Sequence, residues 1–278
     1  MVQVVAVDLD GTLLDEEGYI TGKTKGTIEK LSAGGTFFVP ATGRCWDEIP
    51  DDLLEIKGIQ YAILSNGARI VDLKHDRTLF VNLLEQKDYT PLFEIINTIG
   101  LTYDLVSEGS VFVDECFMED VLHYFKATGK AYSWMPEKYR FVKNLPSEVF
   151  ARSMKVEKFS LRRIPIEKIN TLTNFFTDHP EFEVTSYVFH PNDPLTLEIS
   201  SQNSTKGHAL QTLCSMLELD ISETMAIGDG YNDISMLSAA GFGVAMGNAV
   251  DEAKAAADYV TLTNGEEGVG LALRKFLF

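Results

Sequence analysis

Hydrophobic residues along the chain occur in short runs separated by longer stretches with helical spacing. The first run, Val2–Val7, is rich in β-branched residues and ends abruptly at two aspartates. A helical pattern follows at 24–33 and stops at a Gly-Gly pair, and strand-like runs come next at 37–39 and 61–64. This alternation is typical of a parallel sheet covered by helices. We therefore predict an α/β fold with a Rossmann-like parallel sheet core and helices on both faces.

The same alternation returns near the C-terminus. Residues 206–218 place five apolar side chains on one helical face, those of Ala209, Leu210, Leu213, Cys214 and Leu217. Three strand-like pieces follow, interleaved with short helices, with the sequences TMAIGDG, FGVAMG and DYVTL. Both ends of the chain are thus predicted to build the same domain.

The middle of the chain has a different pattern. A hairpin is predicted at 68–82, and the strand-like pieces beyond it suggest more antiparallel pairing. Amphipathic helices are predicted near 85–99, 117–128 and 165–177. We interpret residues 83–189 as a second, α+β domain inserted between the two halves of the first, 1–82 and 190–278.

Composition narrows the function classes. The chain has 278 residues, and 24 basic against 41 acidic residues give a formal charge of −17, which disfavours a nucleic-acid partner. The sequence contains no run of about 18 consecutive apolar residues, so it does not predict a membrane span. The three cysteines and five histidines are scattered without the spacing of a disulfide framework or a metal site. We expect a cytoplasmic protein with no membrane association.

Four polar motifs stand where a predicted strand ends or a helix begins. They are DLDGT (8–12), PATGR (40–44), STKG (204–207) and GDGYND (228–233). Asp8 and Asp10 lie two residues apart where a strand stops, so both carboxylates can converge beyond its edge. Ligands of open α/β sheets bind outside the carboxyl ends of the strands. Each motif alone is compatible with an ordinary turn, but their combination predicts a functional site.

Together the motifs resemble those of the haloacid dehalogenase superfamily of phosphohydrolases. The stretch 242–269, FGVAMGNAVDEAKAAADYVTLTNGEEGV, and the segment SNGA at 65–68 are similar to the Cof-type sugar-phosphatase branch. The resemblance implies that 1–82 and 190–278 form the catalytic core. It also implies that 83–189 is a cap domain that sets substrate specificity, with hinge closure near 82 and 190.

The resemblance also assigns roles to the acidic residues. Asp8 is expected to be the nucleophile that forms an aspartyl-phosphate. Asp10 is expected to protonate the leaving alcohol and then to deprotonate the attacking water. The implied cofactor is Mg²⁺, bound by Asp8, by Asp10 through its backbone carbonyl, and by Asp229. Asp233 is expected to be a further ligand or to orient the metal-bound waters.

The remaining motif residues are expected to hold the substrate. Five residues are implied to bind the phosphoryl oxygens: Leu9, Thr42, Gly43, Lys206 and Asn232. Arg44, Asn66 and Gly67 are possible substrate contacts. A loop-capping role fits Arg44 equally well, and a turn role fits Asn66 and Gly67 better. Tyr132, Trp134 and His190 of the insertion could line a substrate pocket or belong to its core.

The favoured function is a Mg²⁺-dependent phosphatase acting on a small phosphorylated metabolite, preferably a sugar phosphate. The nearest alternative is a phosphotransferase or mutase of the same superfamily. A different class, the phospho-accepting receiver modules of signalling systems, combines similar residues around an aspartate. The acid–base partner two residues after Asp8 and the long insertion argue against a receiver. The sequence leaves the individual substrate and the oligomeric state open.

Overall fold

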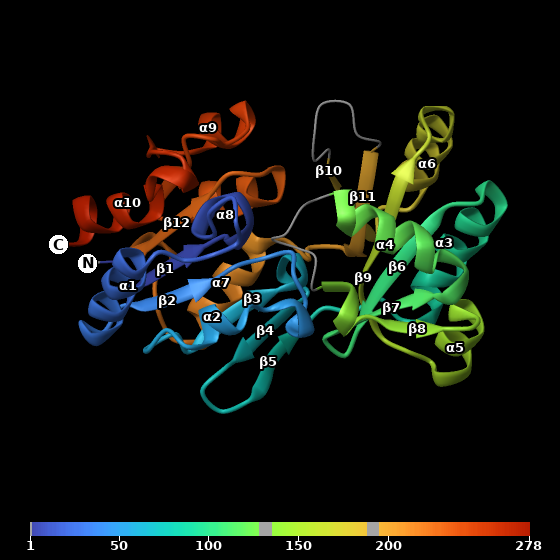
Figure 1. The fold of residues 1–278 in the computed structure, drawn as a ribbon, viewed down its shortest axis with the longest axis horizontal. Helices are drawn as coiled ribbons and strands as arrows, with labels where there is room; N and C mark the ends of the chain where they lie inside the picture. The colour runs from blue at the N-terminus through green and yellow to red at the C-terminus, as the bar shows by residue number, and fades with distance from the viewer. Residues whose placement is uncertain (1, 128–134, 188–194) are drawn as a thin grey trace. The chain divides into compact units, whose positions relative to one another are not determined.

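A computed structural model describes residues 2–127, 135–187 and 195–278 of the chain (Figure 1). It divides into two compact units. The first comprises Met1–Arg44, Ile49–Val81 and Thr205–Phe278, and the second comprises Cys45–Glu48 and Asn82–Ser204. The chain therefore passes between the units at four points, two of them around the short segment 45–48.

The first unit is built on a parallel sheet with the strand order β14-β13-β12-β1-β2. Its strands are β1 (Val4–Val7), β2 (Phe37–Pro40), β12 (Thr224–Gly228), β13 (Phe242–Ala245) and β14 (Tyr259–Val260). All neighbouring pairs run parallel. The side chains of β1 are completely buried, which explains its continuous apolar run.

An antiparallel extension follows β2. Strand β3 (Tyr61–Leu64) meets the parallel sheet through a bridge between Ala41 and Ile63. It then pairs with β4 (Arg69–Asp72), which pairs in turn with β5 (Arg77–Val81). The predicted hairpin at 68–82 is therefore present.

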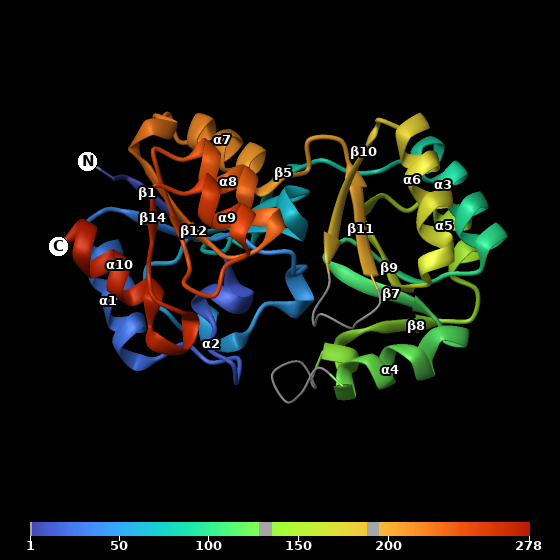
Figure 2. The same cartoon turned by 90° about the horizontal axis from the view of Figure 1, so that it is seen from above.

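Helices cover both faces of the parallel sheet (Figure 2). On one face α1 (Gly22–Ala33) packs against α10 (Gly268–Leu277), and the short α2 (Asp51–Leu54) follows β2. On the other, α7 (Lys206–Met216) packs against α8 (Ile234–Ala239), which contacts α9 (Asp251–Ala256). Right-handed crossovers explain this division, because the chain adds β2 on one side of β1 and later adds β12, β13 and β14 on the other side.

The second unit contains a mixed sheet with the order β10-β11-β9-β6-β7-β8. Its strands are β6 (Thr102–Ser107), β7 (Ser110–Asp114), β8 (Arg140–Val142), β9 (Val156–Ile164), β10 (Phe182–Tyr187) and β11 (Leu195–Ser201). Its helices are α3 (Gln86–Ile99), α4 (Met118–Ala127), α5 (Leu145–Arg152) and α6 (Ile166–Asp178). Among the described strands of this second sheet, only β7 and β8 pair in parallel.

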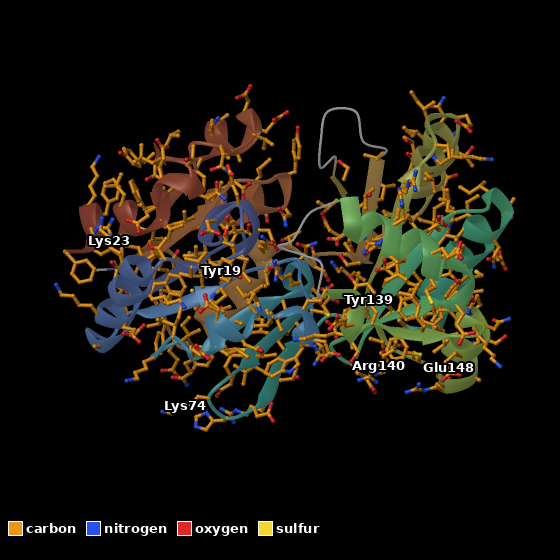
Figure 3. All side chains as sticks on the ribbon, viewed as in Figure 1. Tyr19, Lys23, Lys74, Tyr139, Arg140 and Glu148 are labelled. Carbon is orange, nitrogen blue, oxygen red and sulfur yellow. The ribbon has the colours of Figure 1, made fainter. Side chains whose placement is uncertain are left out.

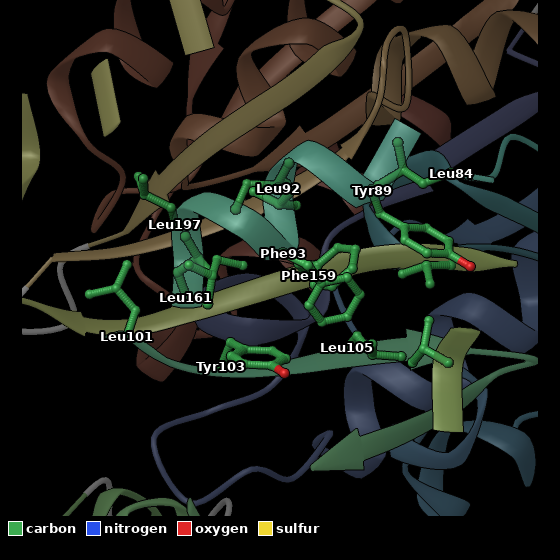
Figure 4. Close-up of a cluster of buried hydrophobic side chains, with 14 of the residues drawn as sticks. Leu84, Tyr89, Leu92, Phe93, Leu101, Tyr103, Leu105, Phe159, Leu161 and Leu197 are labelled. Atoms are coloured by element: carbon green, nitrogen blue, oxygen red, sulfur yellow. The ribbon is translucent and has the colours of Figure 1, made fainter. Parts of the chain in front are cut away.

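An aromatic cluster forms the core of the second unit (Figure 4). Side chains of α3, α5 and α6 pack there on one face of the sheet. Phe93 of α3 lies edge-on to Phe159 of β9, with the ring centroids 5.3 Å apart. Tyr89 and Tyr103 extend the cluster at both sides of this pair. The insertion therefore has a hydrophobic core of its own.

The predicted fold class is confirmed, with some local differences. Strand β8 and helix α5 were not predicted, because both are short and their apolar residues do not show a clear period. In α6, within the range predicted as an amphipathic helix, the apolar side chain of Ile166 is 83% exposed because this residue begins the helix. Strand β11 pairs with β9 and β10, so the second unit continues to Ser204 rather than ending near 190. Tyr132, Trp134 and His190 lie outside the described residues.

In the part of the chain that the structure describes, no helix combines the length and the apolar character needed to cross a bilayer.

We predict that Phe159→Ala destabilises the second unit. Phe159 is completely buried and contacts three aromatic rings, so truncation should lower the free energy of unfolding by about 3–5 kcal/mol. Urea unfolding followed by near-UV circular dichroism measures the effect. Ile166→Ala is the control, because a side chain exposed at this level should change the unfolding free energy by less than about 0.5 kcal/mol. A Phe159→Ala midpoint equal to that of the control would contradict the assignment.

Candidate active site

The candidate site begins at the carboxyl end of β1. The Asp8 amide donates to the Ile227 carbonyl at 2.9 Å, which extends the pairing of β1 and β12 by one residue. The chain then makes one wide turn, Leu9–Leu13, closed by a bond from the Leu13 amide to the Asp8 carbonyl at 3.2 Å. The Asp8 side chain is only 8% exposed. The turn therefore holds a nearly buried carboxylate at the edge of the sheet.

Gly11 permits a close approach between this turn and Asp229. Its φ is +76°, and a Cβ built at this position would lie 2.5 Å from Oδ2 of Asp229. Thr12, the next residue, donates from Oγ1 to Oδ1 of Asp229 at 2.7 Å. This role of Thr12 was not predicted, and its place in the DLDGT motif is the signal for it in the sequence. The turn after β1 thus fixes a carboxylate that follows β12.

Three carboxylates and one lysine form the centre of the site. Carboxylate oxygens of Asp8, Asp229 and Asp233 all lie within 4.8 Å of one another. Lys206 Nζ, which is fully buried, contacts Oδ1 of Asp8 at 2.5 Å and Oδ1 of Asp233 at 2.6 Å. Three ionised carboxylates against one ammonium leave two excess negative charges. Uncompensated buried charge is unfavourable, so this donor set is suited to a divalent cation.

The pKa values of these groups reflect the charge imbalance. Burial, followed by the Asp233 carboxylate, raises the pKa of Asp8 well above its ordinary value. Burial and Asp233 also raise the pKa of Asp229 to about 7. Burial alone would lower the pKa of Lys206, but the carboxylates of Asp233 and Asp8 outweigh it and raise that pKa. The lysine therefore stays protonated, while Asp8 and Asp229 need a further positive charge nearby to ionise fully.

Backbone groups position Asp233 and Lys206. Oδ2 of Asp233 accepts hydrogen bonds from the amides of Asp229 and Gly230, both at 2.9 Å. Lys206 begins α7, and a Cβ on the following Gly207 would lie 2.3 Å from the Ser235 carbonyl oxygen. This contact brings the start of α7 directly against α8. The lysine can therefore reach both carboxylates from a helix held close to them.

The loop after β2 and the loop after β3 form a second side of the site. Thr42 is buried, and its carbonyl accepts from the Asn66 amide at 3.0 Å. Asn232 Nδ2 donates to Oδ1 of Asn66 at 3.0 Å. A Cβ on Gly43 would approach that same oxygen to 3.0 Å. Asn66 therefore connects the second motif to the fourth through its side chain.

Two other residues expected near the substrate are fixed by the packing. A Cβ on Gly67, whose φ is +101°, would lie 2.3 Å from the Thr205 carbonyl oxygen. Gly67 thus allows the loop after β3 to pack against the residue that precedes Lys206. The Leu9 side chain is fully buried in the core, so only its backbone can take part in binding.

Arg44 pairs with Asp10. Nε of Arg44 donates to Oδ2 of Asp10 at 2.9 Å, and Nη2 donates to Oδ1 at 2.6 Å. The Arg44 side chain is 5% exposed, whereas that of Asp10 is 35% exposed. This two-point contact fixes the plane of the Asp10 carboxylate next to the acidic cluster.

Comparisons with known proteins agree with this geometry. The sequence model of haloacid dehalogenase-like hydrolases matches residues 5–273. The chain is 28% identical to the 5-amino-6-(5-phospho-D-ribitylamino)uracil phosphatase YcsE of Bacillus subtilis, over 99% of this chain and 96% of that protein.

Solved structures give the same result. A haloacid dehalogenase-like hydrolase from B. subtilis superposes with a TM-score of 0.83 at 26% identity, covering 99% of this chain and all of the other. The HAD subclass IIB sugar phosphatase BT4131 superposes with a TM-score of 0.78 at 25% identity, covering 99% and 98%. The family predicted from the motifs is confirmed, and so is the enzyme class of phosphoric monoester hydrolases. The chain belongs to the haloacid dehalogenase-like hydrolases.

Proposed function

We propose that this enzyme is a Mg²⁺-dependent phosphatase that hydrolyses a small phosphorylated metabolite through an aspartyl-phosphate on Asp8. The observation that carries the proposal is the cluster of Asp8, Asp229 and Asp233 around Lys206, with its excess of two negative charges. Asp8, Asp229, Asp233 and the backbone carbonyl of Asp10 would hold the metal. When bound, Mg²⁺ neutralises the phosphoryl oxygens that a carboxylate nucleophile would otherwise repel.

The first half-reaction transfers the phosphoryl group to the enzyme. A carboxylate oxygen of Asp8 attacks phosphorus, and the bond from phosphorus to the substrate oxygen breaks. Asp10 gives its proton to that oxygen, so that a neutral alcohol leaves. Lys206 stays protonated beside Asp8 and attracts the transferred group. Hydrolysis of phosphate monoesters needs accelerations of up to ~10²¹, which explains why charge neutralisation and covalent catalysis are combined.

The second half-reaction releases phosphate. Asp10, now ionised, removes a proton from water, and the water oxygen attacks phosphorus. The bond to Asp8 breaks, and the free carboxylate and inorganic phosphate are formed. The same side chain thus acts first as acid and then as base, and this regenerates the starting protonation state.

The surrounding donors would hold the phosphoryl oxygens in both steps. Thr42 and Asn232 offer directed hydrogen bonds, the backbone amides of Leu9 and Gly43 offer further donors, and Lys206 offers a full charge. Support comes from the contact of Asn232 with Asn66, which in turn touches the loop of Thr42 and Gly43. Arg44 and Asn66 would contact substrate only at the margin, since both already bond other site residues.

The substrate class follows from the relatives rather than from the site. YcsE is named for a ribityl phosphate derivative, and BT4131 is named a sugar phosphatase. We propose a sugar or polyol phosphate as the substrate class for this enzyme. The core motifs recognise only the phosphoryl group, so the choice among substrates is assigned to the inserted domain, 83–189 in the sequence.

Replacement of the nucleophile tests the mechanism. Asp8→Asn should reduce phosphate release from p-nitrophenyl phosphate with Mg²⁺ by about 10⁴-fold or more, because an amide cannot form the acyl-phosphate. A matched control is Asp251→Asn, an exposed aspartate in the first turn of α9 that should leave the rate unchanged. Hydrolysis by Asp8→Asn at more than a hundredth of the parent rate would contradict the assignment.

Metal binding should depend on pH through Asp229. Its pKa is raised to about 7 in the metal-free protein, so protons compete with Mg²⁺ increasingly as the pH falls below that value. Competition by the Asp229 proton alone predicts that the apparent Mg²⁺ dissociation constant rises at least about eightfold between pH 7.5 and pH 6, because the raised pKa of Asp8 adds in the same direction. Isothermal titration calorimetry measures it directly. Asp229→Asn should bind Mg²⁺ weakly at both pH values, and its dissociation constant should change less with pH. Equal affinity of the parent protein at both pH values would refute the role of Asp229.

A panel of phosphorylated compounds tests the substrate class. We expect kcat/KM to be highest for a sugar or polyol phosphate and lower for phosphotyrosine and for nucleoside monophosphates. Measuring alcohol and inorganic phosphate together separates hydrolysis from transfer, because a phosphotransferase yields less phosphate than alcohol, and a mutase converts the substrate into an isomeric phosphate ester with little release of either. A preference for phosphoamino acids would overturn the proposed class, and a persistent phosphate deficit would replace hydrolysis by transfer.

A further inference from the structure

Arg44 stands at a junction between the two units. Its side chain makes the two-point contact with Asp10 inside the first unit. Its backbone is also fixed there: its amide donates to Thr42 Oγ1 at 3.1 Å, and its carbonyl accepts from the Ser65 amide at 2.9 Å. The whole residue is therefore held by the loops that form the candidate site.

The next four residues belong to the second unit. Cys45 is fully buried in an apolar cluster with Val106, Val111, Val113, Val121 and Tyr139. The Asp47 amide donates to the Gly109 carbonyl at 3.0 Å. A Cβ on Gly109 would lie 2.8 Å from the Cβ of Trp46, so Trp46 sits directly on the hairpin between β6 and β7. We call residues 45–48 the tether.

Glu48 fixes the tether from within. Its Oε1 accepts from the Tyr139 hydroxyl at 2.8 Å, and its Oε2 accepts from the Cys45 amide at 3.0 Å. Glu48 is 7% exposed, and Tyr139, whose side chain is labelled in Figure 3, is 8% exposed. Hydrogen bonds of a buried carboxylate are costly to lose. The tether is thus bound to the second unit as firmly as a core segment.

We propose that Arg44 is a positioning residue for Asp10 and that the tether couples its position to the second unit. Consecutive Cα atoms are 3.80 Å apart, so only two backbone dihedrals separate the fixed Arg44 from the fixed Cys45. A change in the second unit at the tether is therefore absorbed by those dihedrals or passed to the pair of Arg44 and Asp10. This inference rests on the proposed acid–base role of Asp10.

The chemistry of arginine makes this positioning specific. A guanidinium group bonds a carboxylate at two points and sets its plane, whereas an ammonium group is a point charge that leaves the carboxylate free to rotate. Misplacement of a reacting group by about 1 Å can cost about 10²-fold in rate. Arg44→Lys therefore keeps a positive charge next to Asp10 but no longer fixes the plane of the Asp10 carboxylate.

Two aryl phosphates of similar shape separate acid catalysis from binding. p-Nitrophenolate leaves without help, whereas phenolate needs a proton from Asp10 as the bond to phosphorus breaks. We expect Arg44→Lys to lower kcat/KM for phenyl phosphate by about 10²-fold and for p-nitrophenyl phosphate by less than about fivefold. Tyr139→Phe, which removes the hydroxyl bonded to Glu48, should lower the phenyl phosphate value several-fold with the same selectivity. Arg152→Lys and Tyr19→Phe, at exposed positions, are the matched controls.

Asp10→Asn serves as the reference and distinguishes the two proposals. If it loses phenyl phosphate turnover selectively, the acid–base role stands, and if it loses none or loses both substrates equally, the proposed function of Asp10 fails. With a selective Asp10→Asn, equal losses for both substrates in Arg44→Lys, or no loss, overturn the positioning role. A selective loss in Arg44→Lys without one in Tyr139→Phe overturns the coupling through the tether. Thermal unfolding of each variant identifies misfolding. If Arg44→Lys does not fold, the substrate selectivity of Tyr139→Phe tests the proposal in its place.

Discussion

The fully buried ammonium group of Lys206 is the contact on which the rest of the site depends. It joins Asp8, which follows β1, to Asp233, which belongs to the loop after β12. Without this cation, three carboxylates at the edge of one sheet would repel one another in a place with little water to screen them. One lysine balances only one of the three negative charges. The two that remain make the site suited to a divalent cation.

Close backbone approaches make this arrangement possible. A Cβ on Gly11 would meet the Asp229 carboxylate, and a Cβ on Gly207 would meet the Ser235 carbonyl. A third such position is Gly228, where a Cβ would lie 2.5 Å from the Asp233 side chain. The glycines of the motifs are therefore needed for space around the charges, and only Gly11 among these three also needs its positive φ. The glycines recur in the motifs because the close packing around the carboxylates leaves no space for a Cβ at these positions.

Under the proposed function, the two units have different chemical roles. The first contains every charged residue assigned to phosphoryl transfer, on loops supported by a parallel sheet and two layers of helices. The second has an aromatic core of its own. The tether is the exception, because it inserts a piece of the first motif-bearing region into the apolar cluster of the second unit. Specificity and catalysis would then be linked through the backbone next to Arg44.

By itself the sequence determined the motifs and most of the elements, because both are local; the short β8 and α5 were not predicted. The apolar run of β1 and the period of α7 depend only on neighbours in the chain, and the four motifs each follow such an element. The tertiary structure decided which groups meet. Thr12 reaches Asp229, Asn66 reaches Asn232 and Arg44 turns to Asp10. Strand order and loop packing set these pairings, and no spacing along the chain encodes them. The tether was hidden for the same reason: its partners Gly109 and Tyr139 lie far along the chain and become neighbours only when the second unit folds.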